Sequence, residues 1–187
     1  MFRDASLANP NTTSWDTSNV IDMSSMFSGA SVANPNTSGW DTTKVTNMGF
    51  MFNGASLAAP DTTSWSTANV TKMRSLFRNT SLANPNTSGW DTSSVTTMQD
   101  MFREASLADP VMSSWNFANV INMEDMFTGV TLSTVKYSDL LNLIHSQSTQ
   151  VNVNLGGGNS LYNAGAVTAR TILTTVNGWT ITDGGLE

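Results

Sequence analysis

Cysteine is absent from the 187-residue chain, and histidine occurs only once, as His145. The lack of cysteine excludes disulfide scaffolds, cysteine-rich zinc sites and thiol catalysis. A single histidine excludes histidine-rich metal sites and argues against a Ser-His-Asp hydrolase. We therefore expect neither enzymatic activity nor a cofactor, and we assign His145 a structural role in a C-terminal helix.

Charge is also scarce, and most of it is negative. Only 12% of the residues are charged, and 14 acidic residues against 8 basic ones give a net charge of −6. A nucleic-acid partner is disfavoured, because binding phosphate groups needs clustered basic charge. Long apolar runs are missing as well, and we expect no membrane span.

The polar part of the composition, mostly Ser, Thr and Asn, could belong to a disordered chain, but the aromatic residues indicate an ordered repeat. The chain contains six Trp and eight Phe, and disordered chains are poor in large aromatic residues. Five Trp, five Pro and six Phe each recur at an interval of 25 residues, which predicts a solenoid of stacked units. They are Trp15, Trp40, Trp65, Trp90 and Trp115; Pro10, Pro35, Pro60, Pro85 and Pro110; and Phe2, Phe27, Phe52, Phe77, Phe102 and Phe127.

The repeat divides the chain into two parts. Residues 1–132 are predicted to form the repeat solenoid, and residues 133–187 a C-terminal capping segment with its own helices and strands. Met1 and Phe2 already stand in phase with the repeat. We therefore expect the chain to be a piece of a longer protein. The repeat units are 1–25, 26–50, 51–75, 76–100, 101–125 and a partial unit 126–132.

Two local patterns within each unit predict one short helix and one short strand. Val20, Met23, Phe27 and Ala30 have the spacing of one helical face. The Thr-rich segment 11–15 follows an Asn-Pro dipeptide and reads as a strand. In the capping segment, the patterns predict helices around 137–144 and 167–176, and strands at 151–155 and 179–182.

The unit resembles the repeat of bacterial leucine-rich-repeat-like surface proteins, the DUF285 or BspA-like family. The resemblance rests on the string W-D-T-S-N-V at residues 15–20 with Met23, Met26 and Phe27, and on its equivalent at residues 40–45. It implies an α/β fold, a right-handed leucine-rich-repeat-type solenoid, on the surface of bacteria, with roles in adhesion and protein binding. The family usually has an apolar residue three positions before the Trp, where this chain has Thr12, Thr37, Thr62, Thr87 and Met112.

Two adjacent hydroxyl columns are the first candidate binding site. If one column faces outward, it forms a regular array at strand spacing that suits carbohydrate or ice. The alternative is that Thr fits a pleated sheet and one column points inward, because neighbours in a strand face opposite sides. Met112 favours the first column as the inward one. The candidates are Thr12, Thr37, Thr62 and Thr87 in that column, and Thr13, Ser38, Thr63 and Ser88 beside it.

A second column, before the expected helix, contains Asp16, Asp41, Ser66, Asp91 and Asn116. Stacked carboxylates could bind calcium, and Asp16, Asp41 and Asp91 are weak candidates for it. Asp, Ser and Asn are also the residues that cap helices, which favours a capping role. We interpret the Trp column as a core spine, and the basic residues Arg3, Lys72, Arg74, Arg78 and Arg103 as a solvated face.

These patterns together favour a non-catalytic, extracellular binding module of a bacterial surface or adhesin protein. We expect it to recognise a protein or glycan on a host or neighbouring cell through the solenoid face. Two alternatives are a structural spacer that extends an adhesin, and an ice-binding or ordered-carbohydrate-binding face made by the Thr/Ser ladder.

Overall fold

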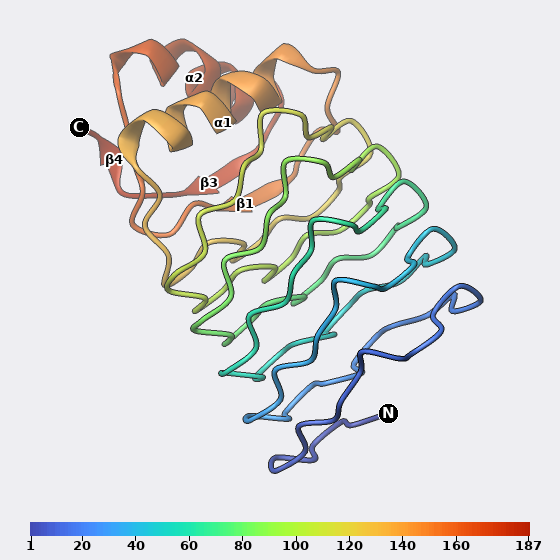
Figure 1. The fold of residues 1–187 in the computed structure, drawn as a ribbon. Helices are drawn as coiled ribbons and strands as arrows, with labels where there is room; N and C mark the ends of the chain where they lie inside the picture. The colour runs from blue at the N-terminus through green and yellow to red at the C-terminus, as the bar shows by residue number, and fades with distance from the viewer.

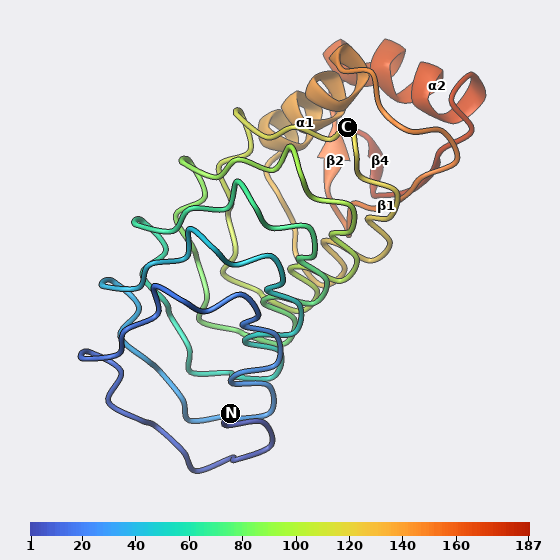
Figure 2. The ribbon, with the colours of Figure 1, turned by 90° about the vertical axis from the view of Figure 1, so that its right-hand side faces the viewer.

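The computed structural model describes all 187 residues as a stack of 25-residue coils closed at one end by two helices (Figure 1). The N-terminus lies at the open end of the stack, and helices α1 (Thr134–Ser146) and α2 (Val167–Thr175) cover the other end. Seen from the side, successive coils follow nearly the same path, one behind the other (Figure 2). Neither helix has the length and apolar composition required to span a membrane.

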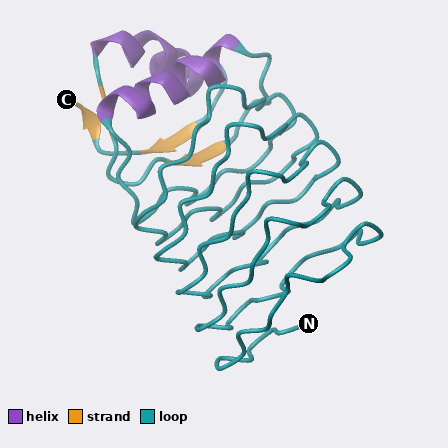
Figure 3. Ribbon diagram, in the orientation of Figure 1, coloured by secondary structure: helices purple, strands orange, loops and turns teal.

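The coils contain neither of the elements that their sequence predicts, since residues 1–133 form turns and extended links (Figure 3). The segment 20–30, expected to be helical, is a series of tight turns. Its N–H groups at Met23 and Phe27 donate to Asn47 and Met51 of the next coil, at 3.0 and 2.8 Å. A helix would need those N–H groups within its own turns. The apolar spacing arises because the turns direct the same side chains into the core.

Left-handed backbone at two positions of each coil also excludes a helix. Ser25 has φ of 54° and Gly29 has φ of 72°, and their equivalents in later coils are similar. L-residues adopt this conformation singly, in turns, and not within right-handed helices. The first position holds Ser25, Phe50, Ser75, Asp100 and Asp125.

The predicted strand at residues 11–15 is absent because side chains replace the backbone ladder there. The hydroxyl of each buried Thr in the first column donates to a backbone carbonyl of the next coil, at 2.6–2.8 Å. A second buried ladder makes the same contact five residues further along, at 2.9–3.0 Å. The two ladders are Thr12, Thr37, Thr62 and Thr87, and Thr17, Thr42, Thr67 and Thr92.

Aromatic rings fill the interior of the stack in register. Neighbouring Phe rings of the Phe2–Phe127 column stack with centroids 5.6–5.9 Å apart. The Trp column is buried from Trp40 onward, which confirms it as a core spine, and Trp15 packs half-buried at the open end. Offset stacks of this kind add to the burial of apolar area that holds the coils together.

The capping segment contains both predicted helices and continues the backbone ladder. The strand predicted at 179–182 forms at 180–182, whereas the one predicted at 151–155 forms only at 154–156, and a further strand pair was not predicted. Strand β1 (Asn154–Gly156) receives the N–H groups of Met123 and Phe127, and β3 (Thr180–Thr182) pairs with β1 in parallel. A second parallel pair joins β2 (Leu161–Tyr162) to β4 (Gly185–Leu186). A short 3-10 turn (Ala164–Ala166) leads into α2. His145 lies exposed in the last turn of α1, where a cation is favourable.

Replacing Thr62 by Val tests the inner ladder, because Val keeps the shape and removes the hydroxyl. The carbonyl of Asn86, now bonded at 2.8 Å, loses this buried donor. We expect the free energy of unfolding, measured in urea, to fall by about 1–2 kcal/mol. The adjacent Thr63→Val is the matched control, since Thr63 is exposed and its hydroxyl makes no such bond. Equal stability of the two variants would contradict the ladder.

Replacing Ser75 by Gly tests the left-handed turn. Ser75 has φ of 53°, and its buried hydroxyl has no hydrogen-bond partner. Gly adopts a left-handed φ without strain and has no buried hydroxyl to leave unbonded, so we expect about 1 kcal/mol of added stability in thermal unfolding. The reverse change, Gly54→Ala at φ of 74°, is expected to destabilise the fold by a similar amount. A destabilised Ser75→Gly protein would show that the turn tolerates L-residues without cost.

Candidate binding face

The first hydroxyl column lies inside the protein and cannot meet a ligand. Each of its four Thr side chains is buried, and each hydroxyl is already bonded to the next coil. The inward alternative therefore holds for this column. Thr12, Thr37, Thr62 and Thr87 are corrected from candidate ligand residues to structural ones, because only the inward orientation lets their hydroxyls replace a backbone ladder.

The second hydroxyl column is exposed, but it does not form a uniform Thr array. The hydroxyls of Ser38 and Ser88 donate to the side-chain oxygens of Asn36 and Asn86 in their own coils, at 2.8 and 2.7 Å. Two of its five members are Thr and three are Ser, so a methyl group is present in only some coils. We call this surface the hydroxyl wall. It consists of Thr13, Ser38, Thr63, Ser88 and Ser113, all exposed.

The Asp column caps turns rather than helices. The carboxylate of Asp91 accepts the N–H of Ser93 at 2.9 Å, and Asn116 accepts the N–H of Ala118 at 2.8 Å in the same geometry. Asx turns of this kind need only a side-chain oxygen, so Asn serves as well as Asp. The same pattern recurs at residues 11 and 22 of the first coil. The expected capping role is correct, but what is capped is a corner of the coil.

Hydrogen bonds at these corners lower the pKa of the exposed carboxyl groups. For Asp16, Asp41 and Asp91, the hydroxyl of the residue two positions on is the largest cause and its N–H is the second. The corner bonds therefore favour the ionised form. No three Asp, Glu, His or Cys side chains lie close enough together to hold a metal ion.

The surface over the backbone ladder carries side chains that vary from coil to coil. Asn47 donates to Asp22 at 3.1 Å, and Gln99 donates to Glu124 at 3.4 Å, so neighbours in each column point to the same side. We call this surface the ladder face. Its first column is Asp22, Asn47, Lys72, Thr97 and Asn122, and its second is Ser24, Gly49, Arg74, Gln99 and Glu124.

The sequence reading treated Lys72 and Arg74 as part of the solvated side of a helix and so missed this face. The available signal was the variation between coils. The hydroxyl wall repeats Thr or Ser in every coil, whereas the ladder-face columns change charge and size from coil to coil. Positions outside the core can vary in this way without disturbing the stack, which a recognition surface requires.

A hollow of about 480 Å³ lies where the last full coil meets α1. It is lined by Val111, Met112, Val135 and Leu140, with Lys136 ion-paired to Asp109 nearby. Val111 and Met112 replace the Asn and Thr of most other coils. The chain enters α1 at this point, so no further carbonyl awaits a Thr hydroxyl, and an apolar residue packs better. We therefore attribute this departure from the repeat to the junction.

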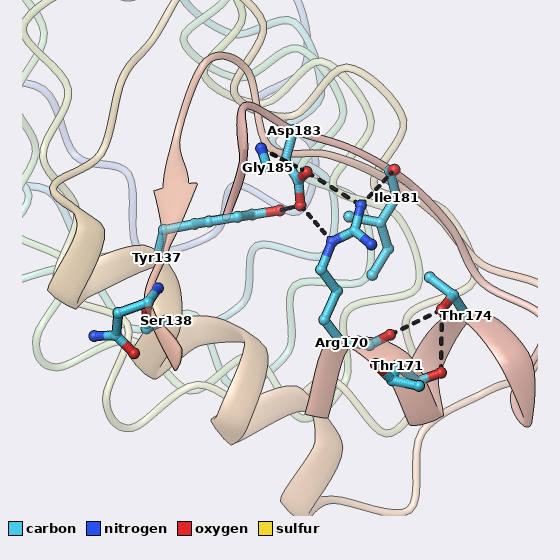
Figure 4. Close-up of polar contacts among 9 residues, drawn as sticks. Tyr137, Ser138, Arg170, Thr171, Thr174, Ile181, Asp183 and Gly185 are labelled. Atoms are coloured by element: carbon cyan, nitrogen blue, oxygen red, sulfur yellow. Dashed lines mark hydrogen bonds and ion pairs between the residues drawn. The ribbon is translucent and has the colours of Figure 1, made fainter. Parts of the chain in front are cut away.

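A buried polar cluster holds the cap together (Figure 4). The carboxylate of Asp183 accepts the hydroxyl of Tyr137 at 3.0 Å and two guanidinium bonds from Arg170 at 2.9 and 3.1 Å. Burial, followed by the charge of Asp183, raises the pKa of Tyr137, which stays neutral. Arg170 also reaches the carbonyl of Ile181 in β3, at 3.5 Å. The cluster ties both helices to the segment after β3, and its partners, far apart in a non-repeating segment, gave no sequence signal.

A comparison against family models matches the part of the chain that carries the repeat. The family described as "Mycoplasma protein of unknown function, DUF285" matches residues 1–81 and, overlapping them, residues 57–153. The chain therefore belongs to the DUF285 family. No curated protein and no solved structure matches it.

Replacing Asp91 tests the corners through their pH dependence. A carboxyl group with a lowered pKa in the folded state stabilises the fold above its unfolded pKa, and that contribution is lost as the pH falls through the folded value. Asp91→Asn keeps the turn but cannot ionise. We expect its melting temperature to lie slightly below that of the wild type at pH 7, with a smaller difference at pH 3.

Asp91→Ala is the matched second variant, because it loses the turn as well as the charge. It should melt below the Asn variant at both pH values. An Ala variant as stable as the Asn variant would mean that the corner bond to Ser93 contributes nothing.

Proposed function

We propose that the chain is a non-catalytic, extracellular binding module of a bacterial surface or adhesin protein. In this proposal the coils are a right-handed solenoid of leucine-rich-repeat type, and the partner is a protein or glycan on a host or neighbouring cell. The observation that carries the proposal is the contrast between columns. Buried columns and corner residues repeat from coil to coil, while the ladder face varies.

A stacked repeat suits recognition because its stability and its surface are set by different residues. Each coil is held by Thr hydroxyls, stacked rings and backbone bonds. On the ladder face, Asp22, Asn47 and Asn122 also cap turns, but Lys72 stands at the same position of another coil, so no particular side chain is required there. The face can therefore change while the stack stays the same. The spacer alternative needs no varied face. For the ice or ordered-carbohydrate alternative, only the hydroxyl wall remains as a possible binding surface, because the first hydroxyl column is buried.

A pair of double variants separates these possibilities. Thr97→Asp with Gln99→Glu changes the ladder face using residue types that the same columns already hold, as Asp22 and Glu124, so the fold should tolerate both. Thr63→Asp with Ser64→Glu makes the same change in charge on the hydroxyl wall and its neighbouring column. We expect the first pair to weaken binding at least tenfold and the second to leave it unchanged.

Binding is measured with fluorescently labelled protein on intact bacterial and epithelial cells and on a glycan array. Loss of binding only in the wall variant would favour the carbohydrate alternative. No binding by the wild type to any of these surfaces would leave the spacer. Thermal unfolding of each variant serves as the control for folding.

A further inference from the structure

Two cations at the centre of the ladder face have no acidic partner. Lys72 and Arg74 are both exposed, and neither takes part in any of the five salt bridges of the chain. Their neighbours along the columns are uncharged, namely Asn47 and Thr97 beside Lys72, and Gly49 and Gln99 beside Arg74. An acidic chain with 14 carboxylates could have paired them. The unpaired charges form a positive centre on a negative protein, which attracts an anionic group.

An aromatic ring fixes one of these cations in place. The guanidinium of Arg74 lies over the ring of Phe50, 5.3 Å from its centroid. Phe50 holds a left-handed backbone position, φ of 59°, where the other coils have Ser or Asp. Ser and Asp adopt this conformation more readily than a bulky aromatic residue does. The ring of Phe50 gains a specific contact with the Arg74 guanidinium, and an Arg held on a ring is a typical anchor of protein interfaces.

Apolar side chains flank this positive centre at both ends of the adjacent exposed column. Ile21 and Ile121 are 60% and 62% exposed, and Thr46, Thr71 and Thr96 lie between them. At about 4.8 Å per coil, the two Ile residues lie about 19 Å apart, which an extended peptide of about six residues spans. Exposed Ile side chains suit the apolar side chains of a protein segment better than the hydroxyl-rich surface of a glycan. The flanking Ile residues therefore favour a protein over an acidic sugar.

We propose that the ladder face binds an extended segment of a partner protein, with an Asp or Glu carboxylate at Lys72 and Arg74 and apolar side chains against Ile21 and Ile121. The proposal rests on the binding role proposed above and names the chemistry of the partner. Arg offers two parallel N–H donors to a carboxylate, and the ring of Phe50 keeps that fork in position before the partner arrives.

The probe is a phage library of random 12-residue peptides selected against the full chain. We expect enriched peptides to carry Asp or Glu about three residues from an apolar residue on each side. A synthetic peptide of the enriched sequence should bind Arg74→Ala at least tenfold more weakly than the wild type. Phe50→Ser, which restores the residue type of the neighbouring coils, should weaken it severalfold. Arg3→Ala, an exposed cation outside the ladder face, is the matched control and should change nothing.

The outcomes that overturn the proposal are specific. Enriched peptides without acidic residues, or peptides that bind Arg74→Ala as well as the wild type, would contradict the carboxylate anchor. Acidic glycans bound in an Arg74-dependent way would replace the protein partner. Cell binding that survives Arg74→Ala but is lost in the Thr97→Asp/Gln99→Glu variant would remove this anchor alone, and no cell binding by the wild type would remove the proposed function itself.

Discussion

The interaction on which the rest of the structure depends is the bond from each buried Thr hydroxyl to a carbonyl of the next coil. It fixes the register, because a coil one residue longer or shorter would move the hydroxyl of Thr62 away from the carbonyl of Asn86. Once the register is fixed, Phe stacks on Phe and the ladder of N–H groups from Met23 onward meets its acceptors. The 25-residue period is therefore a geometric requirement of these bonds. It also explains why the side of the coil that lacks a backbone ladder is the side rich in Thr.

The period, the core columns and the cap could be predicted from the sequence, and the local conformation of the coils could not. Stacking imposes identical residues at a fixed interval, so the positions of Trp40 and Phe52 reveal the architecture directly. The apolar spacing at 20–30 misled the helix prediction because inward-pointing turns and a helix can place side chains at similar intervals. What decides between them is where the N–H groups donate, and those partners lie in another coil, 24 residues away. The cap helices have ordinary amphipathic patterns and were predicted nearly to their bounds.

For the candidate site too, the repeating features could be predicted from the sequence and the non-repeating ones could not. Sequence reasoning found the hydroxyl columns because they repeat, and repetition turned out to mark structure: Thr12 is buried, and the Asp91 carboxylate closes a corner. The ladder face does not repeat, so a search for periodic columns passes over it. The Asp183 cluster escaped for a related reason, because Tyr137 and Asp183 meet only after the cap has folded.

The C-terminal end of the backbone ladder gives a reason why the proposed recognition would use the ladder face and not the capped end. At the C-terminal end, β3 would offer an open edge to another strand, but Arg170 reaches the carbonyl of Ile181 while Asp183 holds the guanidinium in place. Blocking an edge with a charged side chain is a common defence against unwanted strand pairing. A further strand is thus kept from extending the ladder there, which leaves the varied columns at the side as the surface that the proposed binding role would use. Changes in those columns leave the inter-coil hydroxyl bonds and the stacked Phe rings in place.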